Sequence, residues 1–150
     1  MYLKLQYSRF NELAWREYEC LVREFIEKHN SEKDHFALTG TLGEHGVMQG
    51  PDGEKVKIPE FYWKTICFNE NGTTWSVALV AKNLNSEDTA RSEAFMPLQK
   101  FSETYLDGRA IYGPECQNAG LGPWEKVLEN FSQFKTSLNC TFAVTDNKRL

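Results

Sequence analysis

Hydrophobic spacing near the N-terminus predicts one long amphipathic helix over residues 11–30. Its apolar positions share the spacing of a single buried helix face: Trp15, Tyr18, Val22, Phe25 and Ile26. At about 100° per residue, Asn11 falls in the middle of this face, and Glu19 lies roughly 80° from Asn11, at the edge of the face. An amide and a carboxylate are therefore expected to point inward or sideways, where polar groups need partners.

Two structural roles would also account for these polar residues. Asn is a favoured helix N-cap, so Asn11 could begin the helix. Glu19 could pair with Arg23, which follows it by four residues. Spacing alone favours these roles over a metal site, because caps and i,i+4 ion pairs are far commoner.

Two short alternating stretches, followed by a run rich in aromatic and β-branched residues and its antiparallel partner, predict a β-meander behind the helix. The expected strands cover residues 35–39, 55–58, 61–68 and 74–81, with a glycine-rich turn or hairpin tip over 44–54. A polar loop over 83–92 and two short helices, over 97–104 and 124–134, complete the pattern. The chain is predicted to be an α+β protein.

Composition indicates one folded domain, over residues 1–150. The chain is 41% hydrophobic and 13% aromatic, which is typical of a globular protein. No run approaches the roughly 20 apolar residues of a membrane helix, so no membrane association is expected. A net charge of −4 argues against binding nucleic acid through bulk electrostatics.

The four cysteines are widely spaced and lack a C-x-x-C pair, which argues against structural zinc and fits disulfides. Sequons begin at Asn71, Asn130 and Asn139. Both features favour secretion, although the first residues lack the apolar region of a signal peptide.

Three short motifs follow one another along the chain. The first is a spaced set on the predicted helix and just before it: Gln6, Asn11, Trp15 and Glu19. The second is Thr39-Gly40-Thr41, and the third runs from Ile58-Pro59 to Trp63-Lys64. In spacing and order these motifs resemble the DNA/RNA non-specific endonucleases of the ββα-metal fold, which include endonuclease G and secreted invertebrate nucleases. The resemblance covers about residues 6–107 and leaves 108–150 as a C-terminal extension.

This resemblance implies an antiparallel sheet packed on the long N-terminal helix. It also implies that Asn11 is the direct protein ligand of one Mg²⁺ (or Mn²⁺), that Glu19 holds the water ligands, and that Gln6 orients the site. Mg²⁺ is a hard ion that prefers oxygen ligands and keeps several waters. The substrate implied is DNA or RNA, and a homodimer is compatible with the family.

One departure bears on activity. The general base of the family is the His of a D-R-G-H motif upstream of the helix, and the sequence contains no such motif. We expect His29, His35 and His45 to be surface residues that do not replace it. Residues 1–5 do not match the pattern either, so we expect an N-terminally truncated family domain, without its first strands and with weak or no cleavage alone.

Three hypotheses follow. The first is a Mg²⁺-dependent, sequence-non-specific endonuclease domain, with Arg9, Arg16 and Lys64 as candidate phosphate contacts. The second is a catalytically inert nuclease-like module that binds nucleic acid or a protein. The third is a secreted, disulfide-bearing domain that shares only the scaffold. Compartment, substrate preference and oligomeric state do not follow from the residues, although secretion is favoured over a mitochondrial location.

Overall fold

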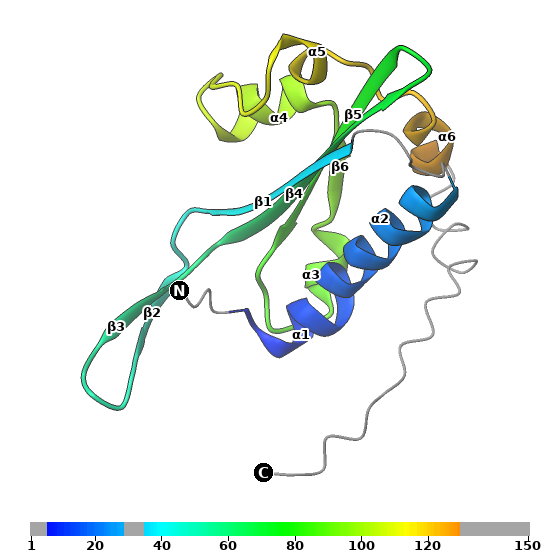
Figure 1. Ribbon diagram of the computed structural model, residues 1–150. Coiled ribbons are helices and arrows are strands. Elements are labelled where there is room, and N and C mark those ends of the chain that lie inside the picture. Colours follow the sequence, from blue (N-terminus) through cyan, green and yellow to red (C-terminus); the bar gives the residue numbers. More distant parts are fainter. Residues whose placement is uncertain (1–5, 29–34, 130–150) are drawn as a thin grey trace.

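A four-stranded antiparallel sheet forms the centre of the protein. The computed structural model describes residues 6–28 and 35–129. The sheet has the order β1-β4-β5-β6 and contains these strands: β1 (His35–Leu42), β4 (Phe61–Glu70), β5 (Thr73–Lys82) and β6 (Ala94–Met96). A separate hairpin of β2 (Gly46–Gln49) and β3 (Lys55–Ile58) projects from the body between β1 and β4 (Figure 1).

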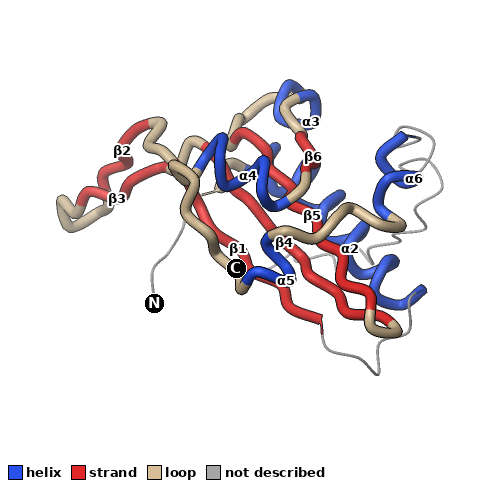
Figure 2. Tube along the Cα trace, turned by 90° about the horizontal axis from the view of Figure 1, so that it is seen from above, coloured by secondary structure: helices blue, strands red, loops and turns tan. Residues whose placement is uncertain are grey.

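Helices lie on both faces of this sheet (Figures 1 and 2). One continuous helix covers the first face and consists of α1 (Ser8–Phe10), the π-helical turn η1 (Asn11–Trp15) and α2 (Arg16–Lys28). The remaining helices are short: α3 (Asp88–Arg91), α4 (Leu98–Tyr105), α5 (Pro114–Gln117) and α6 (Trp124–Glu129). Of these, α4 and α5 lie on the face opposite the long helix.

The long helix packs on the sheet through aromatic side chains. Buried Phe10, Trp15 and Tyr18 contact Tyr62 and other apolar residues of β4 and β5. The Tyr18 hydroxyl donates a hydrogen bond to the backbone carbonyl of Val80 in β5 (2.7 Å). Burial raises the pKa of Tyr18 well above its usual value, so this hydroxyl keeps its proton and pins the helix to the sheet.

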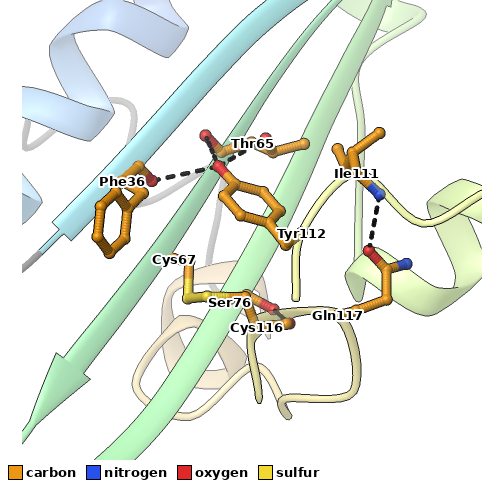
Figure 3. Close-up of a disulfide and its surroundings, with 8 residues drawn as sticks. All are labelled: Phe36, Thr65, Cys67, Ser76, Ile111, Tyr112, Cys116 and Gln117. Carbon is orange, nitrogen blue, oxygen red and sulfur yellow. Dashed lines mark hydrogen bonds between the residues drawn. A yellow bond between two sulfur atoms is a disulfide. The ribbon is translucent and has the colours of Figure 1, made fainter. Parts of the chain in front are cut away.

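A disulfide and a tyrosine attach the segment around α5 to the face of the sheet opposite the long helix. Cys67 of β4 is bonded to Cys116 of α5, and the Tyr112 hydroxyl lies within hydrogen-bonding distance of the Thr65 hydroxyl (3.1 Å) and the Phe36 carbonyl (3.3 Å) (Figure 3). Burial raises the pKa of Tyr112, and the bond to Thr65 opposes that rise. These contacts fasten the segment before α5 across β1 and β4.

The α+β prediction is confirmed, and the disulfide prediction is confirmed for Cys67 and Cys116. Cys20 is disulfide-bonded as well. His35 and His45 are exposed, as predicted, whereas His29 and the sequons at Asn130 and Asn139 lie outside the described residues.

Some boundaries were predicted wrongly. The helix begins at Ser8, not at Asn11, and the predicted loop after β5 contains α3 and is followed by the three-residue strand β6. The predicted turn or hairpin tip over 44–54 contains a strand of its own, β2, which pairs with β3 to form a hairpin. No helix among the described residues is long and apolar enough to cross a membrane.

Candidate functional site

The π-helical turn η1 begins at the candidate metal ligand. The backbone N–H of Asn11 donates to the Tyr7 carbonyl (3.0 Å), so Asn11 lies within a continuous helix and the N-cap prediction is wrong. Phe10 and Trp15, five residues apart, stack with ring centroids 5.8 Å apart. Phe10 is fully buried and Asn11 is exposed, so the expectation that Asn11 faces the core is also wrong. The physical reason is the wider turn, which a regular helical wheel omits.

Lys64 lies beside Trp15 and within electrostatic range of Glu19. The Lys64 ammonium lies 4.9 Å from the centroid of the Trp15 ring, a cation–π distance. Burial lowers the pKa of Lys64, and the nearby Glu19 carboxylate partly offsets this effect. Glu19 itself is exposed at the flank of α2. The long helix and β4 therefore hold a carboxylate and a partly desolvated cation within electrostatic range of each other.

Two of the sequence motifs are neighbours across the β1–β4 ladder. Thr39 pairs with Lys64, and Gly40 pairs with Trp63. A side chain at position 40 would overlap the Trp63 indole, so glycine is required there by a close aromatic contact on the face opposite Lys64. The Thr-Gly motif and the Trp-Lys motif thus form one unit that sets the position of Lys64.

A buried asparagine, Asn83, ties the start of the helix to the sheet. Its Oδ1 accepts a hydrogen bond from the Tyr7 backbone N–H (3.0 Å), and its Nδ2 donates to the Pro59 carbonyl (3.0 Å). Its own backbone N–H donates to the Glu60 carbonyl (2.8 Å). From the sequence, this residue was expected only as the start of a polar loop over 83–92.

Tyr62 lies beneath the same part of the helix. Its ring contacts Phe10 and Trp15 at 5.0 and 5.5 Å between centroids. Among the described residues, its buried hydroxyl has no hydrogen-bond partner, and burial raises its pKa to about 12. The hydroxyl is therefore neutral at physiological pH.

The other predicted residues are distributed around this helix. Gln6 is half-buried and precedes α1, and Arg16 is exposed at the start of α2. The side chain of Arg9 is outside the described residues. Arg23, considered in the sequence only as an ion-pair partner, is an exposed cation one turn beyond Glu19.

The donor chemistry suits a hard cation that keeps its water. Asn11 offers an exposed amide oxygen and Glu19 an exposed carboxylate, both oxygen donors of the kind Mg²⁺ prefers. Within residues 6–28 and 35–129, no three His, Cys, Asp or Glu side chains gather as a ligand set. An ion at Asn11 would therefore be held mainly through water.

A family model described as DNA/RNA non-specific endonuclease matches residues 6–138. The chain belongs to this family. The match includes all three motifs of the helix and the β1–β4 ladder, and it confirms the resemblance seen in the sequence. No curated protein and no solved structure matches the chain.

Membership in the DNA/RNA non-specific endonuclease family supports, in general terms, a nuclease function with nucleic acid as substrate. Such a hydrolase must stabilise charge on a scissile phosphate. Lys64, within electrostatic range of Glu19, and the exposed Asn11 on the same long helix as Glu19 offer chemistry of that kind.

Proposed function

We propose that the protein is a metal-dependent, sequence-non-specific endonuclease domain that hydrolyses phosphodiester bonds of DNA or RNA. The observation that carries the proposal is the exposure of Asn11 and Glu19 on the long helix, together with the electrostatic effect of Glu19 on the Lys64 ammonium. In this proposal Asn11 is the direct ligand of Mg²⁺ or Mn²⁺, and Glu19 orients its water molecules.

Each residue has a distinct task in the proposed site. A bound divalent ion would supply positive charge against the scissile phosphate and the leaving oxygen. The Lys64 ammonium, partly withdrawn from water, would be the second positive charge near the same phosphate. Its attraction for the phosphate is strengthened because water is partly excluded. Arg16 contributes a further exposed charge, and Gln6 helps to orient the site.

The sequence lacks the residue that, in the family, acts as general base and activates the attacking water. It contains no D-R-G-H motif, and general-base catalysis contributes about 10²–10⁴-fold. We therefore propose that this chain alone cleaves weakly. Added imidazole, a small general base, should increase that weak rate.

The test is cleavage of plasmid DNA and double-stranded RNA by the purified chain, with Mg²⁺, with Mn²⁺ and with chelator. We expect slow, chelator-sensitive cleavage that Asn11→Ala abolishes and that Asn118→Ala, at an exposed position in another part of the fold, leaves intact. Calorimetric titration with Mn²⁺ should detect Asn11-dependent binding even when cleavage is too slow to measure. An Asn11→Ala variant that still binds Mn²⁺ and still cleaves would exclude the proposed site.

The second candidate is a catalytically inert nuclease-like module that binds nucleic acid or a protein, and it is favoured by the missing base motif. Binding of labelled DNA without cleavage, in Mg²⁺ and imidazole, would support it.

Secretion is proposed for either candidate, because the disulfide between Cys67 and Cys116 is typical of oxidising compartments. A homodimer is proposed only by analogy with the family.

A further inference from the structure

We propose that the π turn η1 is the device that places Asn11 on the same helix flank as Glu19. The proposal rests on the metal site proposed above, since a shared flank lets the two side chains act on one ion. The rotational position of Asn11 relative to Glu19 on the helix can nevertheless be tested without that ion.

The rotation of the helix gives the first argument. Eight residues separate Asn11 from Glu19, and in a regular α-helix they would lie roughly 80° apart at about 100° per residue. A π turn has i→i+5 hydrogen bonds and so contains one more residue than an α-helical turn. Eight residues that include it rotate about as far as seven α-helical residues, which leaves roughly 20° between the two side chains.

Ring contacts and burial support this register. Phe10 and Trp15 are stacked and buried although five residues separate them, whereas a regular helix would turn them about 140° apart. Asn11, next to Phe10, is exposed, as is Glu19. If the same eight-residue spacing were wound as a regular α-helix, Asn11 would occupy the buried stripe, where an ion could not reach its amide.

The upstream end of the turn is fixed to the sheet. The Tyr7 carbonyl accepts from Asn11, and the Tyr7 N–H donates to the buried Asn83 side chain. The helix α3 also contacts α1 and η1. Because Tyr18 holds the downstream part through Val80, both flanks are anchored, and the additional residue must be accommodated between them.

The first test removes that residue. Deletion of Glu12 would convert the π turn to a regular α-helical turn while Phe10 and Trp15 keep their positions, so Mn²⁺ affinity should stay at the level of the parent chain. Insertion of one alanine after Glu12 should lower Mn²⁺ affinity about 10-fold or more, the scale seen when a group supporting a metal is lost. Circular dichroism and the disulfide state should be compared to ensure that each variant is folded.

The second test reads the register without the native ion. In the variant Asn11→His/Arg16→His, the π turn brings the two imidazoles to adjacent positions, whereas a regular helix would hold them about 140° apart. Added Ni²⁺ should therefore raise the melting temperature of this variant. The single substitution Asn11→His serves as the matched control and should show a smaller rise.

The outcomes separate the two proposals. A folded bis-histidine variant that Ni²⁺ does not stabilise beyond the single variant would overturn the register assignment. A parent chain that binds no Mn²⁺, together with a positive Ni²⁺ result, would reject the metal site and keep the register. Loss of Mn²⁺ binding after deletion of Glu12, in a folded protein whose parent binds through Asn11, would also overturn the proposed role of the turn.

Discussion

The Lys64 ammonium lies over the Trp15 ring, 4.9 Å from its centroid, and so joins the central strand β4 to the helix that carries the candidate site. The contact has two consequences. Trp15 packs against the lysine from one side and helps to withdraw it from water, while the Glu19 carboxylate favours its charged form. A cation kept partly dry in this way is suited to an anionic substrate.

Replacing Lys64 by methionine should weaken nucleic-acid binding without weakening the fold. Because the pKa of Lys64 in the folded state is lowered from 10.5, the unfolded state binds more protons between the two pKa values. The free energy of unfolding therefore rises with pH as it approaches 10.5, and Lys64→Met should lose this rise. The salt dependence of DNA binding should fall by about one charge.

Lys82→Met is the matched control for this substitution. Lys82 also lies over an aromatic ring, 5.7 Å from the centroid of Phe61, but it is exposed at the end of β5. Equal losses of DNA binding in the two variants would contradict a specific role for Lys64. Chemical denaturation measures the free energy of unfolding, and fluorescence anisotropy measures DNA binding.

Gly40→Ala should destabilise the β1–β4 ladder. The added methyl group would overlap the Trp63 indole, and such overpacking costs about 1–3 kcal/mol. Gly46→Ala, with no atom within 4 Å of the new Cβ, should have little effect. In urea unfolding, a Trp63→Leu background should reduce the cost of Gly40→Ala, and strict additivity would argue against the contact.

Tyr62→Phe should leave stability unchanged or raise it, because the buried hydroxyl that it removes has no partner among the described residues. The pKa of Tyr62 is about 12 in the folded state, against a reference value of 10.0. Between pH 10 and 12 the unfolded state therefore loses this proton more readily than the folded state, and the free energy of unfolding falls as the pH rises. Tyr62→Phe should remove this part of the fall.

Tyr112→Phe provides the contrast, since the Tyr112 hydroxyl is within hydrogen-bonding distance of Thr65 and Phe36. Its removal should cost about 1 kcal/mol. Thermal unfolding of both variants between pH 7 and 11 would measure the difference, and a larger loss for Tyr62→Phe would show that its hydroxyl has a partner.

Asn83→Ala should be among the more damaging polar substitutions. It would leave the Tyr7 N–H and the Pro59 carbonyl without their partner, at a cost of about 3 kcal/mol for two unsatisfied groups. Asn85→Ala, at an exposed position in the same loop, should change stability little. Denaturant midpoints decide the comparison, and similar values for the two variants would rule out the proposed anchor.

The pattern of residues determined much of this protein by itself. Alternation in β1 and β3, aromatic and β-branched residues in β4, and the apolar spacing of the long helix predicted an α+β fold, because side chains on one face recur every second residue in a strand and every three to four residues in a helix. The three motifs identified the family, and the glycine of the Thr-Gly motif is explained by its neighbour across the ladder, Trp63.

Tertiary structure decided where the polar groups lie. A helical wheel assumes a uniform rotation per residue and therefore placed Asn11 in the core; the stacking of Phe10 on Trp15 across a π turn places it at the surface. Asn83 looked like a turn residue until Tyr7 and Pro59 were brought to it from distant parts of the chain. Local spacing cannot reveal such contacts, because their partners are set by packing between elements and not by neighbours in sequence.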